Sequence, residues 1–391
     1  MLYYYLPFNN NSLNESDLFF NDEPTQQVIS HTLQEYIVNY KQQIDKVHNE
    51  WDNMKRITNP YEFIHTHVPG GTSSMATLKP LSRSFYKMVE ICNDFNICNQ
   101  DSSINTFHLA EGPGGFIEAL THMRTNSKDK FFGMTLLDDN DNTIPGWKKS
   151  NSFLSKNSDR VIIENGPSND GNLFLVENLS YCYSNYFQKM DLITADGGFD
   201  FSENFNEQEH QAIKLLFSQV IYALCMQKTQ GSFVLKVFDI TSKASLDIIY
   251  LLSCFYKEII ICKPLTSRIA NSEKYIICKN FNPQENYKSI LRNLISNYKN
   301  IMSINNIHSF LKRDHDLIMV SKLEEVNAIF GQQQVENISF TLGLIINRNK
   351  YDRIEQMKRN HINKCIDWCK KYNIPCEHTS EPENIFLQKK K

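Results

Sequence analysis

The amino-acid sequence predicts an α/β fold: a mostly parallel sheet of about seven strands, the last one antiparallel, with helical extensions at both ends of the chain. Between residues 106 and 279, short apolar runs alternate with stretches of helical periodicity, which is typical of βαβ units. Outside this region, apolar residues recur mostly at three- to four-residue steps. Hydrophobic residues make up 41% of the 391 residues, which is enough for a large core.

The N-terminal part is expected to contain two helices separated by a loop. Residues 1–22 are rich in Asn and are expected to be irregular. The pattern from Pro24 to about Arg56 is helical, and so is the pattern at about 81–95. The run VPGGTS at 68–73 predicts a loop between them.

Seven apolar runs in the central region are expected to form the strands. They lie near residues 106–110, 131–136, 160–164, 191–195, 232–238, 258–263 and 274–279. The segments 207–227 and 242–256 carry apolar residues at i, i+3, i+4 and i+7, which predicts helices. Because no helical stretch separates the sixth and seventh runs, the last strand is expected to insert antiparallel. After about Pro283 the pattern is helical to the end of the chain.

These patterns divide the chain into three parts. We expect a helical N-terminal extension over residues 1–58, an α/β domain over 59–283 and a helical C-terminal extension over 284–391.

Charge and cysteine content limit the environment and the partners. The 41 basic and 44 acidic residues give a net charge of -3, so any nucleic-acid contact is expected from a local basic patch. No run of about 18 apolar residues and no signal-like start is present, so neither a membrane span nor secretion is expected. Scattered cysteines, several inside apolar runs (Cys225, Cys254, Cys262, Cys278), predict buried thiols in a reducing compartment. We therefore expect an intracellular protein of the cytoplasm or nucleus, or of a viral factory or virion if the chain is viral.

A glycine-rich segment, EGPGGF at residues 111–116, follows the first predicted strand and opens the next helix. Glycines let the backbone approach a ligand closely, and a helix N-terminus offers free N–H groups. The spacing differs from the dinucleotide pattern G-x-G-x-x-G, and no Lys-Ser/Thr pair follows the glycines as in a phosphate loop. A plain tight turn between strand and helix is the alternative.

Three charged residues mark the ends of later strands. Asp196, in ADGGF, ends the fourth predicted strand, where open α/β sheets bind ligands; capping of the next turn is the alternative. Lys236 interrupts the apolar run FVLKVF, and a charge in a buried strand is costly unless it is paired or functional. A position at the sheet edge would also explain it. Glu273 lies in the polar segment TSRIANSEKY before the seventh strand.

These four motifs, in this order, resemble the FtsJ/RrmJ-type ribose 2′-O-methyltransferases, and more narrowly the mRNA cap 1 enzymes of eukaryotes and large DNA viruses. The resemblance spans about residues 55–282. It implies a Rossmann-like sheet that binds S-adenosylmethionine (SAM) in the domain 59–283, without a metal. Ile269 stands where the family usually has Pro, and Glu111 where relatives often carry other residues; both departures leave the motifs intact.

The family uses a Lys-Asp-Lys-Glu tetrad, which the resemblance assigns to Lys87, Asp196, Lys236 and Glu273, with Lys79 as a rival for the first position. A ribose hydroxyl is a poor nucleophile, so a base must take its proton during methyl transfer. The resemblance makes Lys236 this base. Lysine acts as a base only in its neutral form, which burial and a neighbouring cation such as Lys87 favour. Asp196 would orient Lys236, and Glu273 would hold the ribose or the Lys87 amine.

The resemblance also implies ligand contacts. Cofactor contacts are expected at Glu111, Gly112, Pro113, Gly114, Gly115, Phe116, Thr135, Asn172, Leu173 and Asp196, with Leu136 as a further candidate. RNA contacts are expected at Arg56, Asn206, Glu207, Gln208, Arg268 and Glu273, and the segment Asn59–Glu62 resembles a cap-contacting segment. For the adenine-side and RNA positions, an ordinary loop or a solvated charged surface is the alternative.

One further cluster has metal-binding residue types. It contains His361, Cys365, Cys369, Cys376 and His378. The first three recur at four-residue steps on one predicted helix, and the paired Cys-x-x-Cys spacing of zinc sites is absent from the sequence. Core or half-buried thiols are therefore expected here, and no metal.

The sequence thus predicts an enzyme that transfers a methyl group from SAM to the ribose 2′-oxygen of the first transcribed nucleotide of capped mRNA. Methylation of rRNA or tRNA at the same atom is the alternative among enzymes. A catalytically inactive cap-binding scaffold of a capping or transcription complex is the alternative from another class. Capped mRNA is the expected partner, and the capping or transcription machinery is a candidate.

Overall fold

The computed structural model describes residues 1–9, 12–23, 29–71, 73–138, 140–141, 143–198, 208–347 and 351–376. These residues belong to two compact units. The first unit contains Met1–Gln43 and Leu81–Ile338, and the second contains Ile44–Pro80 and Ser339–Lys391.

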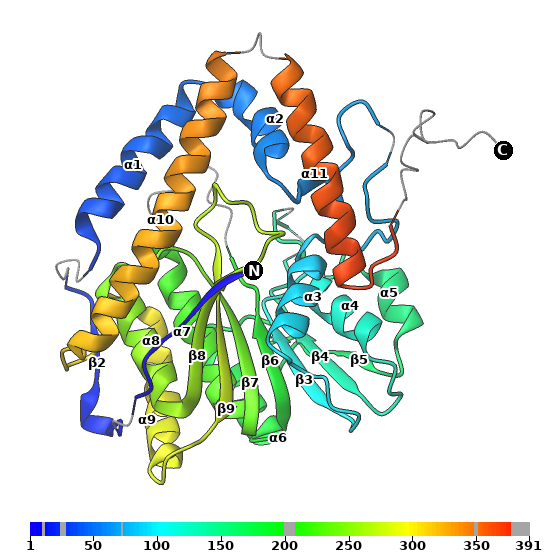
Figure 1. The fold of residues 1–391 in the computed structure, drawn as a ribbon. Helices are drawn as coiled ribbons and strands as arrows, with labels where there is room; N and C mark the ends of the chain where they lie inside the picture. The colour runs from blue at the N-terminus through cyan, green and yellow to red at the C-terminus, as the bar shows by residue number, and fades with distance from the viewer. Residues whose placement is uncertain are drawn as a thin grey trace. The chain divides into compact units, whose positions relative to one another are not determined.

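The first unit is built on an eight-stranded sheet of order β1-β8-β9-β7-β6-β3-β4-β5 (Figure 1). Its strands are β1 (Leu2–Tyr5), β3 (Asn105–Leu109), β4 (Lys130–Met134), β5 (Val161–Ile163), β6 (Met190–Ala195), β7 (Gln227–Val237), β8 (Tyr256–Lys263) and β9 (Lys274–Phe281). Strands β3 to β7 pair in parallel, and β9 runs antiparallel between β7 and β8. The predicted Rossmann-like α/β sheet, its seven strands and its antiparallel last strand are confirmed.

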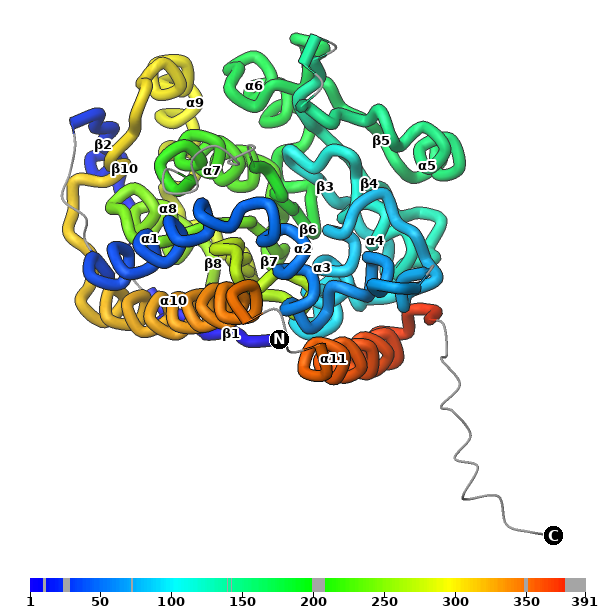
Figure 2. The backbone as a smooth tube through the Cα atoms, turned by 90° about the horizontal axis from the view of Figure 1, so that it is seen from above, coloured from blue at the N-terminus to red at the C-terminus, as the bar shows by residue number. Residues whose placement is uncertain are grey.

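Helices flank this sheet, and the first and last of them extend into the second unit. They are α1 (His31–Asp45), α3 (Ser84–Asp94), α4 (Gly115–Met123), α5 (Asn151–Lys156), α6 (Val176–Tyr186), α7 (Gln208–Met226), α8 (Lys243–Phe255), α9 (Tyr287–Ser303) and α10 (Leu317–Ile346). Helices α3 and α4 pack together on one face, while α6 to α9 lie on the other (Figure 2). Helix α7 packs against α6, α8, α9 and the sheet, so it is buried on almost every side.

The expectation that residues 1–22 are irregular is wrong. They contain β1, the short helix η1 (Glu15–Asp17) and β2 (Leu18–Asn21). Strand β1 pairs antiparallel with β8 and adds an eighth strand, and β2 pairs with β10 (Ser309–Leu311) in a separate two-stranded sheet. Outside the βαβ region, strands of three or four residues show too few alternations for the sequence pattern to reveal them.

The second unit contains α2 (His48–Thr58), η2 (Glu62–Ile64) and α11 (Tyr351–Lys371). Helix α11 packs against α2 and η2. Cys365 and Cys369 are fully buried in α11, as expected for core thiols. Among the described residues no group of three or more His, Cys, Asp or Glu side chains could hold a metal ion, and His378 lies outside them.

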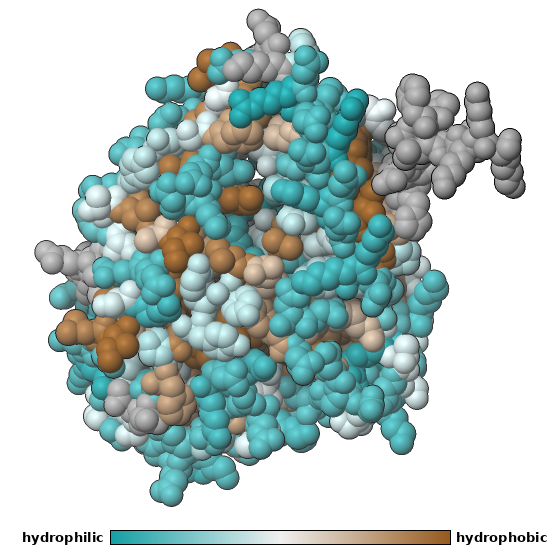
Figure 3. All heavy atoms as spheres, viewed as in Figure 1, coloured by the Kyte–Doolittle hydropathy of each residue, from teal (hydrophilic) through white to brown (hydrophobic). Residues whose placement is uncertain are grey.

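The surface seen in Figure 3 is mostly polar and the thiols are mostly buried, as the composition and the cysteine positions predict. The face in Figure 3 is largely hydrophilic, with scattered hydrophobic patches. All ten cysteines are free, and most are buried, including the four in apolar runs. None of the helices in the described ranges combines the length and apolar character needed to cross a membrane.

Candidate active site

Strand register brings the separate sequence motifs to one edge of the sheet. Ala195 of β6 pairs with Leu235 of β7, so Asp196 and Lys236 follow side by side. Lys236 in turn pairs with Tyr275 of β9, two residues after Glu273. Helix α3 supplies Lys87 to the same place, and all four predicted tetrad residues line one cavity.

Lys236 is held by Asp196. Its Nζ donates to the Asp196 carbonyl oxygen at 2.5 Å and lies 3.4 Å from Asp196 Oδ1. The Tyr275 hydroxyl donates to the same Oδ1 at 2.9 Å. The Lys236 and Asp196 side chains are each 13% exposed, so they are largely shielded yet reach the cavity.

Lys87 forms a second lysine–carboxylate pair, with Glu273. Lys87 Nζ lies 2.6 Å from Glu273 Oε1, and both side chains are largely buried. Burial lowers the pKa of Lys87, and the positive charges of Arg83 and Lys236 act in the same direction. Burial alone would raise the pKa of Glu273, but the ammonium groups of Lys87 and Lys236 hold it well below its usual range. Lys79, the rival assignment, belongs to the second unit.

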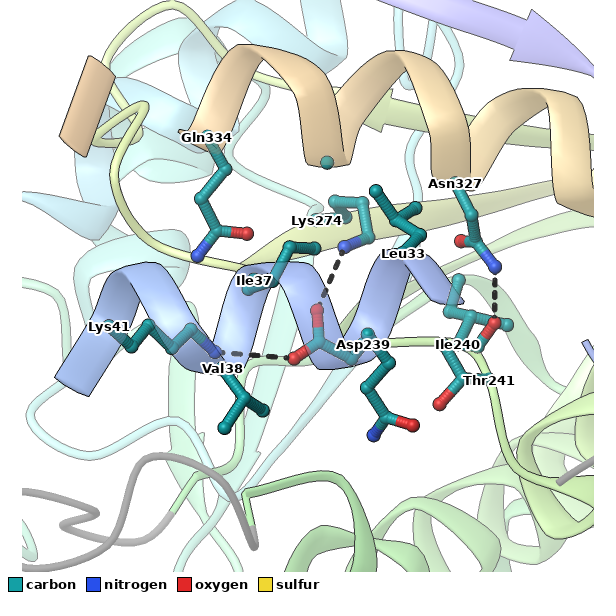
Figure 4. Close-up of a pocket in the computed structure, with 12 residues that line it drawn as sticks. Leu33, Ile37, Val38, Lys41, Asp239, Ile240, Thr241, Lys274, Asn327 and Gln334 are labelled. Carbon is teal, nitrogen blue, oxygen red and sulfur yellow. Dashed lines mark hydrogen bonds and ion pairs between the residues drawn. The ribbon is translucent and has the colours of Figure 1, made fainter. Parts of the chain in front are cut away.

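A cluster of three charged residues, Lys41, Asp239 and Lys274, lies near these residues in the sequence or the fold. Asp239, three residues after Lys236, lies 3.6 Å from the Nζ of Lys41 in α1 and 3.9 Å from that of Lys274 in β9 (Figure 4). Burial acts to raise the pKa of Asp239, but these two lysines lower it overall. The cluster therefore links α1, the segment after β7 and the first residue of β9, which directly follows Glu273.

A buried carboxylate, that of Glu111, supports the glycine loop. Glu111 is 3% exposed and accepts a hydrogen bond from the Phe116 N–H at 2.6 Å, at the start of α4. Burial raises the pKa of Glu111 well above its ordinary value. Gly114 has φ +106°, a conformation that other residues rarely adopt, and a Cβ on Gly115 would overlap the hydroxyl of Ser84. The loop therefore needs glycine at both positions.

The cavity has a volume of about 810 Å³, within the range of small-molecule sites. It is lined by Ser82, Arg83, Ser84, Lys87, Ala110, Gly112, Pro113, Thr135, Leu136, Asp141, Thr143, Ile144, Pro145, Gly171, Asn172, Leu173, Phe174, Asp196, Gly198, Gln208, Leu215, Lys236, Phe238 and Glu273. Six of the predicted cofactor residues are among them: Gly112, Pro113, Thr135, Asn172, Leu173 and Asp196. The other four, Glu111, Gly114, Gly115 and Phe116, are buried and do not line the cavity. They support the glycine loop instead.

The loop 169–173 is fixed against the end of β4. The Leu137 N–H donates to the Asp170 carbonyl at 2.8 Å. Gly171 has φ +63°, and a Cβ there would overlap the Thr135 carbonyl oxygen. Asn172 and Leu173 are thereby held in the wall of the cavity.

The residues present fit SAM, which combines a nucleoside with a positively charged sulfonium and an amino-acid end. Apolar and polar groups of the 169–173 loop and of Leu136 suit the nucleoside. The Asp196 carboxylate suits the positive charge.

The predicted RNA contacts are only partly placed. Gln208 lines the cavity and accepts a hydrogen bond from the Ser272 hydroxyl at 3.0 Å. Arg268 lies in the loop that carries Glu273 but not in the cavity wall, while Asn206 and Glu207 lie outside the described residues. Arg56 is exposed on α2 of the second unit.

In the Asn59–Glu62 segment of the second unit, Asn59 and Glu62 are buried. The Asn59 side-chain amide donates to Glu62 Oε2 at 2.8 Å. A structural role in the second unit explains these two residues.

Several residues of the site were not predicted. Tyr275 and Phe238 contact or face the tetrad, and Asp141, Thr143, Ile144 and Pro145 contribute to the cavity wall. Tyr275 and Phe238 belong to the recognised motifs, so the motifs carried a signal for them. Asp141, Thr143, Ile144 and Pro145 belong to no recognisable motif, so the sequence alone does not connect them with the cavity.

Comparison with known proteins agrees with the arrangement. The sequence profile of FtsJ-like methyltransferases matches residues 80–281. The cap-specific mRNA (nucleoside-2′-O-)-methyltransferase 2 of Danio rerio is 29% identical over 352 residues, which are 86% of this chain and 46% of that protein. The cap-specific mRNA (nucleoside-2′-O-)-methyltransferase 1 of Mus musculus is 35% identical over 188 residues, which are 46% of this chain and 22% of that protein.

The chain spans less than half the length of these relatives. Among solved structures, a SAM-dependent O-methyltransferase from Thermotoga maritima matches with a TM-score of 0.32 and 12% identity, over 54% of this chain and 68% of that one, which is too low to support any argument. The profile, in contrast, covers more than half of the chain, together with every motif of the cavity described above. The chain therefore belongs to the FtsJ-like methyltransferase family.

Proposed function

We propose that this chain transfers a methyl group from SAM to the ribose 2′-oxygen of the first transcribed nucleotide of capped mRNA, with Lys236 as general base in a Lys87-Asp196-Lys236-Glu273 tetrad. The observation that carries the proposal is the pairing of two lysines with two carboxylates on one cavity wall, Lys236 with Asp196 and Lys87 with Glu273. SAM, the cofactor of this family, supplies an activated methyl group when it is bound.

Lys236 has the geometry of a base that is held from one side. A neutral lysine amine has two N–H groups and one lone pair. The two oxygens of Asp196 near Nζ provide acceptors for both N–H groups. The lone pair is then left for the proton of the ribose hydroxyl. Tyr275 fixes the Asp196 carboxylate, so the amine is positioned before the RNA arrives.

The second pair prepares the place of the ribose. Lys87 and Glu273 neutralise each other, and the ionised Glu273 carboxylate is available to accept a ribose hydroxyl hydrogen bond. Arg83, in the same cavity wall, has no ion-pair partner among the described residues, so its guanidinium is suited to a phosphate of the RNA. These contacts would accelerate methyl transfer by holding the ribose close to the base and in the right orientation.

The identity of the RNA rests on the relatives. The two similar proteins named above are both cap-specific mRNA 2′-O-methyltransferases. The FtsJ-like profile that matches this chain spans the four proposed tetrad positions and the glycine loop. This supports capped mRNA as the substrate over rRNA or tRNA.

The test is transfer of labelled methyl from SAM to three matched RNAs that end in an N7-methylated cap, an unmethylated cap or a 5′-triphosphate. Nuclease digestion then locates the label. We expect label on the first ribose of capped RNA and at least a 100-fold lower rate for Lys236→Ala, because the base is lost. Lys228→Ala is the matched control, since Lys228 lies in the same strand but is exposed and pairs with Asp191 at the opposite end of the sheet.

Other outcomes would change the assignment. Equal labelling of all three RNAs would indicate a structural-RNA methyltransferase, and label on the second ribose would move the acceptor by one nucleotide. Tight cap binding without any label would favour the scaffold within a capping or transcription complex. An unimpaired Lys236→Ala variant would remove Lys236 as the base.

A further inference from the structure

Glu90 is a buried carboxylate on the same helix as Lys87, one turn further along α3, and it lies outside the wall of the cavity. It is 0% exposed. Glu90 Oε2 accepts a hydrogen bond from the Leu265 N–H at 2.7 Å, and Oε1 accepts from the Thr266 N–H at 2.8 Å and the Thr266 hydroxyl at 2.6 Å. Three donors from one short segment therefore converge on one carboxylate.

Those donors belong to the loop 264–273, which joins β8 to β9 and carries Glu273. Within this loop, the Ser267 hydroxyl donates to Glu273 Oε1 at 2.8 Å, the same oxygen that lies 2.6 Å from Lys87 Nζ. Ser267 directly follows Thr266. The position of the Glu273 carboxylate thus depends on the segment that Glu90 holds.

The far end of the loop is fixed separately. Lys263 Nζ donates to the carbonyl oxygens of Asn271 at 2.5 Å and Glu273 at 2.8 Å. Lys263 therefore fixes the backbone of Glu273, whereas Glu90 and Ser267 fix the direction of its side chain. Two independent restraints on Glu273, one on its backbone and one on its side chain, are a sign of preorganisation.

We propose that Glu90 is a positioning residue, which holds the segment Leu265–Ser267 against α3 and so sets the Glu273 carboxylate against Lys87. The proposal rests on the proposed function of the Lys87–Glu273 pair. Because Glu90 and Lys87 share one helix, the carboxylate and its partner lysine are placed by the same rigid element. A misplacement of about 1 Å at a reacting group can lower the rate roughly 100-fold, so a residue that touches no substrate can control the reaction.

A purely structural role for Glu90 is the competing explanation. It predicts a destabilised protein whose remaining folded molecules keep the normal kcat. Positioning predicts a lower kcat in molecules that are fully folded, and it predicts that the effect vanishes once Glu273 is absent.

The test uses Glu90→Gln, which keeps the shape but replaces one acceptor oxygen with a donor that faces other donors. Thr266→Val is a milder variant that removes one of the three hydrogen bonds. Asp94→Asn is the matched control, because it makes the same kind of chemical change on the same helix, at a carboxylate that pairs with the N-terminal amine of Met1 at 3.9 Å. We expect kcat to fall about 10- to 100-fold in Glu90→Gln, less in Thr266→Val and less than twofold in Asp94→Asn. Binding of S-adenosylhomocysteine should stay within twofold in all three.

A double-mutant cycle decides between the explanations. In a Glu273→Ala background, adding Glu90→Gln should leave the residual single-turnover rate unchanged. Equal fold-losses in both backgrounds, or an unchanged kcat for Glu90→Gln alone, would overturn the proposal.

The same cycle, measured as shifts of the urea midpoint, needs no substrate. Non-additive shifts for Glu90 and Glu273 are expected, and additive ones would overturn the positioning role. A wild-type chain that is inactive on every RNA would refute the proposed function, while this second cycle would still judge the link between the two residues.

Discussion

Raising the pH from 7 to 9 should stabilise the wild-type chain relative to a Lys263→Met variant. Lys263 is buried at the end of β8, and burial lowers its pKa to about 7. The positive charges of Lys274 and Lys87 act in the same direction, while Glu273 and Asp239 oppose them. In the unfolded chain the pKa of a lysine is about 10.4. Between these two values, the unfolded state binds more protons than the folded state.

The magnitude follows from proton linkage. Stability rises with pH wherever the unfolded state binds more protons, by up to about 1.4 kcal/mol per pH unit for one group. This contribution is complete above about pH 10.4 and is lost as the pH falls through about 7. With the folded pKa at about 7, the gain between pH 7 and 9 is about 2 kcal/mol. Deprotonation leaves two N–H groups, which still serve both carbonyl partners of Lys263.

The assay is urea unfolding at pH 7, 8 and 9, with the free energy of unfolding compared between wild type and Lys263→Met. Lys257→Met is the control, because Lys257 is an exposed lysine of the same strand and its variant should differ from wild type by a constant amount. A difference between wild type and Lys263→Met that is also constant over this range would refute the reasoning. It would mean that the buried Lys263 keeps its proton.

Three further changes test other parts of the structure. Gly171→Ala should weaken binding of S-adenosylhomocysteine at least tenfold in calorimetry, because the new Cβ would overlap the Thr135 carbonyl; unchanged affinity would show that the 169–173 loop does not shape the site. Arg124→Met should lower the free energy of unfolding by about 3 to 5 kcal/mol, because it leaves the buried Asp129 without its charge partner; a loss below 1 kcal/mol would contradict this. Glu209→Ala should destabilise the chain by about 3 kcal/mol or more in urea unfolding, because its carboxylate accepts hydrogen bonds from Thr241, Ser242 and Ser245 at the start of α8.

Much of the first unit was predictable because its strands are buried on both faces. Strands such as β6 and β7 read as short apolar runs between helical stretches, so the sequence pattern identifies them directly. The failures are short strands outside the βαβ region, whereas β5, which is also three residues long, lies within that region and was predicted. Strands β1, β2 and β10 are three or four residues long and gain their partners from distant parts of the chain. No local pattern can reveal such pairing.

The candidate site divides in the same way. Asp196, Lys236 and Glu273 lie in recognisable motifs at strand ends, and the resemblance pointed to them before the register placed them side by side. Glu90 and Lys263 carry no motif signal of their own. Their roles follow from hydrogen bonds to the 264–273 loop, with partners about 175 residues away in the chain for Glu90 and about 10 residues away for Lys263. Such contacts depend on the folded structure and are not encoded in local spacing.

The pairing of β1 with β8 has a consequence for synthesis of the chain. The two strands are about 250 residues apart, and a ribosome that adds roughly 5 to 20 residues per second needs about 12 to 50 seconds to reach the second one. During that interval Leu2 and Tyr4 have no strand to join. Strand β1 can therefore join the sheet only after most of the chain has been synthesised. A nascent chain that forms β8 before recruiting β1 exposes a bare strand edge, which is a site for association between neighbouring chains on one messenger.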